Sequence, residues 1–125
     1  LYEWGGQNAK GVSEFQKMRP GWAMPIHDLM VKNGVTIFFQ GHDHLFARQV
    51  LDGVIYQSVP NPADNTYTAF NRDAYTSGDV LPNSGYLNVT VGADQVTVAY
   101  IRAFLPKDES GANRNGATAF TYTVK

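Results

Sequence analysis

Two histidines separated by one residue are the side chains of this sequence best suited to chemistry. His42 and His44 stand in the run Gln40-Gly41-His42-Asp43-His44. In an extended loop, residues i and i+2 point roughly the same way, so each imidazole could serve one ion of a close pair. Two-metal hydrolases hold their ions about 3.5–4 Å apart, which suits this spacing. We expect Gly41 to let the backbone turn sharply and Asp43 to orient a neighbouring imidazole.

The alternative is that this His-x-His is solvated polar surface, because short motifs often match by chance. Its position favours a site. Val35–Phe39 is a continuous β-branched and aromatic run, which predicts a strand covered on both faces in an α/β sheet. The histidines follow the carboxyl end of that strand, where ligands gather in open α/β sheets.

A helix is predicted just before this strand. Its apolar stripe, at helical spacing, consists of Trp22, Ile26, Leu29 and Met30. Pro25 suits the first turn, and Asn33-Gly34 supplies the stop. His27 lies beside the stripe, and we expect it to be a packing or surface residue. The preceding stretch, Leu1–Gly21, is predicted to be a loop with a short helical turn at Ser13–Met18.

Two hairpins and a final edge strand are predicted after the motif. Their ranges are Ala47–Leu51 with Val54–Val59, Tyr86–Val91 with Gln95–Arg102, and Ala119–Val124. Asp52-Gly53 is a strong two-residue hairpin turn. Pro60–Ser84 is predicted to be a long irregular loop, a kind that is often functional. Its Asn61–Asn65 stretch should return near the metals, where it either borders a substrate pocket or forms a plain turn.

Composition limits the classes of function. The 125 residues suffice for one domain, and 43% hydrophobic content can build a core. The formal net charge is −1 and there are no runs of charged residues, so the sequence does not indicate a basic surface for nucleic acid or an anionic membrane. The longest apolar run is too short to cross a bilayer. Because the chain has no cysteine, a transition metal must be held by His, Asp, Glu or Asn.

The order of helix, buried strand and Gly41-His42-Asp43-His44 resembles the end of the calcineurin-like metallophosphoesterase superfamily, which includes purple acid phosphatases. The resemblance is carried by residues 27–44. It implies the C-terminal part of a four-layer α/β/β/α sandwich, an α/β fold with mostly β-strands after one helix. It also implies that His42 ligates one metal ion and His44 the other. The complete enzyme would hold two transition-metal ions (Fe, Mn, Zn or Ni).

The activity implied is metal-dependent hydrolysis of phosphomonoesters or phosphodiesters, by water activated between the two ions. Arg48 resembles an arginine found four residues after the last histidine in purple acid phosphatases. That family's intervening Tyr-Glu is replaced here by Phe46-Ala47, so a hydroxyl and a carboxylate are lost. The family's other metal motifs normally precede this segment, namely Asp-x-His, Gly-Asp and Gly-Asn-His. None of them precedes it here, and no catalytic residue is assigned.

We therefore expect a single domain, 1–125, that is the C-terminal portion of a catalytic domain and is inactive alone. Residues 1–59 would be the metal-motif segment, 60–84 a long loop and 85–125 closing strands. The partner would be a phosphoester substrate, and exposed sheet surfaces would favour a homo-oligomer. One alternative is a non-catalytic metal-binding or structural module with this fold. Another makes the last strands an accessory domain for oligomerisation or carbohydrate contact.

Overall fold

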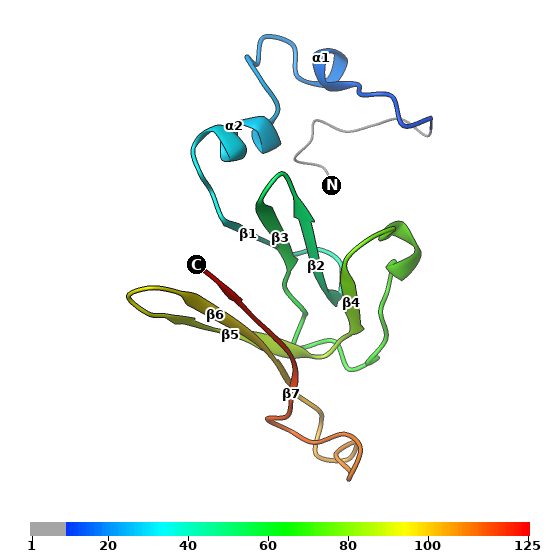
Figure 1. Ribbon diagram of the computed structural model, residues 1–125. Helices are drawn as coiled ribbons and strands as arrows, with labels where there is room; N and C mark the ends of the chain where they lie inside the picture. Colours follow the sequence, from blue (N-terminus) through cyan, green and yellow to red (C-terminus); the bar gives the residue numbers. More distant parts are fainter. Residues whose placement is uncertain (1–9) are drawn as a thin grey trace. The chain divides into compact units, whose positions relative to one another are not determined.

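The computed structural model describes residues 10–125 as a small, mostly β protein with two sheets and short helices (Figure 1). The elements are α1 (Phe15–Met18), α2 (Ile26–Lys32), β1 (Ile37–Gln40), β2 (Leu45–Leu51), β3 (Val54–Ser58), the 3₁₀ turn η2 (Arg72–Ala74), β4 (Asp79–Pro82), β5 (Gly85–Val91), β6 (Val96–Arg102) and β7 (Thr118–Val124). The chain divides into two compact units, Leu1–Thr36 with Asp52–Val54, and Ile37–Leu51 with Ile55–Lys125. No helix in the described residues is long and apolar enough to span a membrane.

The predicted helical turn and helix both form in the first unit, as α1 and α2. Pro25 precedes the first residue of α2, where its missing N–H is not needed. Gly34 ends the helix with a φ of 67°, the left-handed conformation that the sequence predicted. The helix is shorter than expected: it begins at Ile26, so Trp22 of the predicted apolar stripe lies before it. The predicted loop at Leu1–Gly21 lies in part outside the described residues.

The face of α2 that is buried differs from the predicted apolar stripe. His27 and Met30 are 6% and 7% exposed, whereas Ile26 and Leu29 are 39% and 50% exposed. His27 can be buried because its Nε2 lies 3.0 Å from a carboxylate oxygen of Asp52. The expectation that His27 is a packing residue is confirmed. The apolar stripe predicted the helix correctly. It did not predict that the face carrying His27, which contacts Asp52, would be buried.

The first sheet of the second unit has the strand order β1-β3-β2-β4. The predicted hairpin is confirmed: Asp52 and Gly53 have φ values of 47° and 83°, the pair of positive angles that a type I′ turn requires. β1 runs parallel to β3, and β2 runs antiparallel to β4. The prediction of a strand covered on both faces is wrong. Among the described residues β1 pairs with β3 alone, at one end of the sheet, and Phe39 is 43% exposed.

The stretch predicted as one long loop contains two elements, η2 and β4. Strand β4 is four residues long and pairs with the start of β2, so that Val80 lies opposite Ala47 and Leu81 opposite Phe46. Such a strand is too short to show the alternation of apolar and polar residues that reveals longer ones. Its partners in β2 lie 31 to 37 positions earlier in the chain, from Arg48↔Asp79 to Leu45↔Pro82, so local sequence did not reveal the pairing.

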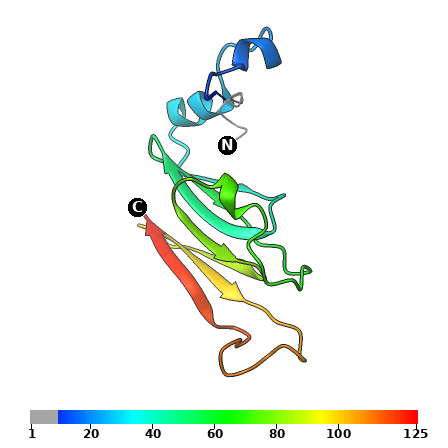
Figure 2. The ribbon, with the colours of Figure 1, turned by 90° about the vertical axis from the view of Figure 1, so that its right-hand side faces the viewer.

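The second sheet is antiparallel, in the order β5-β6-β7 (Figure 2). The β5–β6 hairpin matches the prediction, with Val91 opposite Val96 beside the turn. The predicted final edge strand is also confirmed, because β7 pairs with β6 from Thr118 to Val124. Along β6 the alternating residues Val98 and Tyr100 are buried, whereas Val89 and Val91 of β5 are exposed.

The two sheets pack against each other through aromatic rings and one buried amide. Phe46 of β2 is fully buried and stacks on Tyr100 of β6, with ring centroids 5.0 Å apart. The ring of Phe120 in β7 lies 5.2 Å from Phe46. Gln57 of β3 is also fully buried, and its Oε1 accepts a hydrogen bond from the Tyr122 hydroxyl. The core of the second unit is therefore a sheet-on-sheet interface.

Replacing Phe46 by Ala should destabilise the protein by roughly 3–5 kcal/mol, because the ring is fully buried between the sheets. The matched control is Phe70→Ala, which makes the same change at a ring that is 64% exposed. The control should alter stability by about 0.5 kcal/mol or less. Urea unfolding of the two variants measures the difference. Equal losses would show that the sheets do not pack through Phe46.

Candidate metal-ligand site

Two loops meet at one edge of the first sheet because β1 and β3 are parallel. Gln40 at the end of β1 lies opposite Ser58 at the end of β3. Parallel strands end at the same edge, so the segments that follow them start side by side. The backbone N–H of Val59 donates to the Gln40 carbonyl at 2.7 Å and extends this pairing. The segment after β1 carries His42 and His44, and the segment after β3 carries Asn61–Asp64.

His44 has a polar partner at each ring nitrogen. Its Nδ1 lies 2.7 Å from Oδ2 of Asp64, and its Nε2 lies 3.3 Å from Nδ2 of Asn61. The His44 side chain is 46% exposed, whereas that of Asp64 is 15% exposed. Hydrogen bonds from Thr66 lower the pKa of Asp64, and the contact with His44 lowers it further. Asp64 is therefore a carboxylate at neutral pH, with its charge directed at the imidazole.

The expectation that Asp43 orients a neighbouring imidazole is not what the contacts show. The Tyr75 hydroxyl donates to one oxygen of Asp43 at 2.6 Å, and the Asn71 side chain donates to the other at 3.0 Å. Both carboxylate oxygens thus receive hydrogen bonds from the segment that precedes β4. The carboxylate that contacts an imidazole of the motif is Asp64, twenty residues after His44.

His42 is exposed and holds a backbone conformation that side chains rarely adopt. Its φ is 96°, and residues with a positive φ other than glycine cluster at functional sites. The sequence predicted that Gly41 would take the sharp turn, but Gly41 is not among the glycines with a positive φ. Residues 42–44 form bends, so the argument from an extended loop does not apply to the directions of His42 and His44.

The described residues at this edge of the sheet do not supply enough ligands for a metal ion. No group of three or more His, Asp or Glu side chains among residues 10–125 is arranged to hold a metal ion. Imidazole suits transition metals, and a carboxylate behind a histidine is the usual support of a ligating imidazole. His42 and His44 have side chains of the type that binds transition metals, but they do not form a metal site by themselves.

The buried side chain of Asn83 fixes the loop that supports His44. Its Oδ1 accepts the backbone N–H of Asn61 at 2.8 Å, and its Nδ2 donates to the carbonyls of Asn61 and Asp64 at 2.8 and 3.0 Å. Asn83 is fully buried and meets the loop with both ends of its amide. Sequence reasoning marked the Asn61–Asn65 stretch as near the motif. It gave no signal for Asn83, whose partners lie about twenty residues away.

The residues after His44 belong to the core instead of a substrate site. Phe46 and Ala47 are 0% and 1% exposed, and the Phe46 ring stacks on Tyr100 of the second sheet. The guanidinium of Arg48 lies 4.7 Å from the ring centroid of Tyr122 and 3.4 Å from a carboxylate oxygen of Asp79. In this protein the arginine after the motif takes part in packing and in an ion pair.

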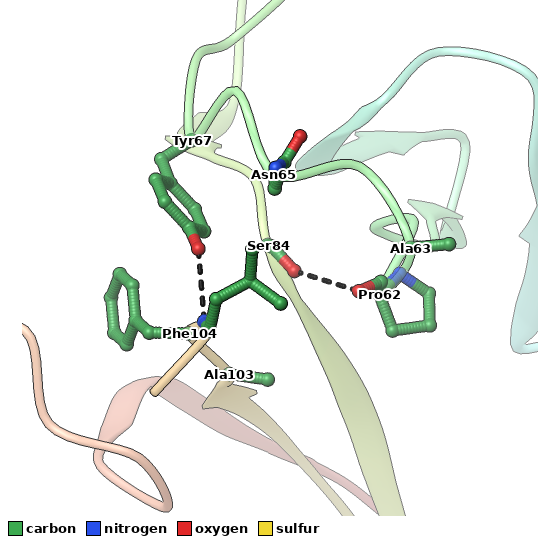
Figure 3. Close-up of a pocket in the computed structure, with 8 residues that line it drawn as sticks. Pro62, Ala63, Asn65, Tyr67, Ser84, Ala103 and Phe104 are labelled. Carbon is green, nitrogen blue, oxygen red and sulfur yellow. Dashed lines mark hydrogen bonds between the residues drawn. The ribbon is translucent and has the colours of Figure 1, made fainter. Parts of the chain in front are cut away.

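A small pocket lies beside the Asn61–Asn65 loop (Figure 3). Its volume is ≈ 150 Å³, and it is lined by Pro62, Ala63, Asn65, Tyr67, Ser84, Ala103, Phe104 and Leu105. The Tyr67 hydroxyl accepts the Leu105 N–H at 3.0 Å and donates to Asp108 at 3.0 Å. Drug-sized ligands occupy about 300–1,000 Å³, so this pocket has room for one small group. The Asn61–Asn65 stretch forms a turn, in which the Asp64 N–H donates to the Asn61 carbonyl at 3.3 Å, and three of its residues line this pocket.

Comparison with models of protein families gives no match, and comparison with curated proteins gives none either.

The Asn83→Ala variant should lose roughly 2–4 kcal/mol of stability, because it removes the partners of the Asn61 N–H and the Asp64 carbonyl, both of which are partly buried. Asn88→Ala is the matched control, since Asn88 is exposed on β5. We expect the control to change stability by less than about 0.5 kcal/mol. Thermal and urea unfolding measure both. A loss no larger than that of the control would mean that the amide does not hold the loop.

Proposed function

We propose that this chain is the closing metal-binding segment of a dinuclear metallophosphoesterase, in which His42 ligates one ion and His44 the other. The reaction would be hydrolysis of a phosphomonoester or phosphodiester. The observation that carries the proposal is the meeting of two loops at the carboxyl ends of parallel strands. The Gly-His-x-His segment follows β1, and the loop after β3 carries Asp64. The carboxylate of Asp64 lies 2.7 Å from His44. This is the place and the kind of pairing that metal sites in α/β sheets use.

The architecture supports the same proposal at a coarser level. A mixed four-stranded sheet packs on an antiparallel three-stranded sheet, as the inner layers of an α/β/β/α sandwich would. We propose that the chain contributes these strands to such a sandwich. The bridging carboxylate and the general acid of the reaction would come from a segment that carries the family's other motifs.

The residues of this chain would bind and orient. When bound, two metal ions supply an activated water and neutralise charge on the phosphoryl oxygens. His42 and His44 would hold ions as neutral imidazoles, which add no negative charge to repel a phosphoester. Asp64 would keep the His44 ring in place, and Asn83 would keep Asp64 in place. Arg48 would have no direct part, because it contacts Tyr122 and Asp79.

A second candidate function is a non-catalytic metal-binding or structural module with the same strands. The observation that favours it is the lack of a three-residue ligand group among residues 10–125. Two imidazoles alone would hold a divalent ion weakly, and no turnover would follow. Hydrolysis separates the two candidates, since both predict metal contact at the two histidines.

Metal contact is tested by adding Co²⁺ or Mn²⁺ in steps to the isotope-labelled chain and following the histidine resonances by NMR. We expect the paramagnetic ion to broaden or shift His42 and His44 first, because they carry the exposed imidazoles of the motif. His27 is an internal control, since it is 6% exposed and its ring contacts Asp52. Equal effects at all three histidines, or an effect at His27 alone, would contradict the proposal.

The enzymatic part is tested by hydrolysis of p-nitrophenyl phosphate and bis-p-nitrophenyl phosphate. We expect no turnover by the chain alone and turnover when it is joined to a segment carrying the Asp-x-His and Gly-Asn-His motifs. His42→Ala/His44→Ala should abolish that turnover, whereas His27→Gln should retain it if the variant folds. Retention of activity by the double variant would refute the assignment. A joined protein that binds metal without turnover would favour the module.

A further inference from the structure

The orientation of one side-chain amide determines where the proton of His44 lies. Oδ1 of Asn61 accepts the backbone N–H of Ala63 at 2.9 Å, so the oxygen side of this amide faces the loop. Its nitrogen side therefore faces His44, with Nδ2 3.3 Å from Nε2. An amide nitrogen only donates hydrogen bonds. The Nε2 atom of His44 must accept this bond, so it carries no proton.

The second contact of His44 requires the same tautomer. A neutral imidazole without a proton on Nε2 carries its proton on Nδ1. Nδ1 lies 2.7 Å from the Asp64 carboxylate, which only accepts. The opposite tautomer would face N–H against the Asn61 N–H group and a lone pair against a carboxylate. The contacts with Asn61 and Asp64 therefore both place the proton of His44 on Nδ1.

We infer that Asp64 is a positioning residue, which holds the His44 proton on Nδ1 and presents the Nε2 lone pair to an incoming divalent transition-metal ion. The single 3.3 Å contact with Asn61 is long for a hydrogen bond, and it is the contact that a metal ion would replace. The choice of metal as the incoming group rests on the proposed function. The tautomer and the role of Asp64 in holding it do not.

The loop supports this role through contacts that do not involve His44. Oδ1 of Asp64 accepts the Thr66 backbone N–H at 2.9 Å, and the Asp64 carbonyl accepts a bond from Asn83. With one oxygen fixed on Thr66, the other is directed at Nδ1 of His44. A carboxylate so anchored orients the ring and selects its tautomer, as carboxylates behind ligating histidines do.

The Asp64→Asn variant gives a sharp test because it should reverse the tautomer without removing the loop contact. The oxygen of the new amide would remain on Thr66 N–H, which leaves its NH₂ group beside Nδ1 of His44. Nδ1 would then accept across the short 2.7 Å contact, and the proton would move to Nε2, where it faces the Asn61 N–H group only across the longer 3.3 Å contact. Asp73→Asn is the matched control, because it makes the same change at an exposed residue of η2.

The measurement is the ¹⁵N spectrum of the histidine rings at about pH 8, above the ordinary histidine pKa of about 6.5. We expect a proton on Nδ1 of His44 in the wild type and in Asp73→Asn, and on Nε2 in Asp64→Asn. A wild-type proton on Nε2, or a tautomer that Asp64→Asn leaves unchanged, overturns the inference. The wild-type spectrum decides even if Asp64→Asn does not fold.

The same samples separate this inference from the proposed function. Added Zn²⁺ should shift the Nε2 resonance of His44, with affinity about tenfold or more weaker in Asp64→Asn. If Zn²⁺ does not move His44 in the wild type while the tautomer is as expected, the proposed metal function fails and the positioning by Asp64 stands. If Zn²⁺ binds equally well to both proteins, Asp64 does not position a metal ligand.

Discussion

The side chain of Asn83 joins two parts of the second unit that are distant in sequence. It lies between β4 and β5, is fully buried, and makes three hydrogen bonds to the backbone of the segment after β3. That segment carries Asn61 and Asp64, the two partners of His44. A buried amide costs free energy unless all its groups are paired. The three hydrogen bonds of Asn83 therefore favour one conformation of this loop. The geometry around His44 depends on that constraint.

In the same unit, exposed polar residues are followed within two positions by residues of the buried core. His42 and His44 stand at the exposed end of β1, and Phe46 already lies between the sheets. Side chains in a strand alternate between faces, yet Leu45, Phe46 and Ala47 are all buried because both faces of β2 are covered at this point. The side chains of Leu45, Phe46 and Ala47 therefore contribute to packing.

Local patterns predicted the elements whose cause is local. The Asp52-Gly53 turn, the stop at Gly34 and the β5–β6 hairpin follow from positive φ preferences and from alternation, and all are present. The features that were missed depend on residues far away in sequence. β4 exists because it pairs with β2, and α2 buries His27 because Asp52 meets it. Likewise the sequence placed the histidines after a strand, but only the fold shows that Asp64 lies beside His44.

The Asn61–Asp64 loop also affects the thermodynamics of any ligand that reaches His44. Its backbone is tied to Asn83, and its side chains are tied to Ala63, Thr66 and the imidazole. The conformational entropy of these residues is lost when the protein folds, so little remains to be lost on binding. A ligand at Nε2 of His44 would meet a pre-organised loop and would replace the 3.3 Å contact with Asn61.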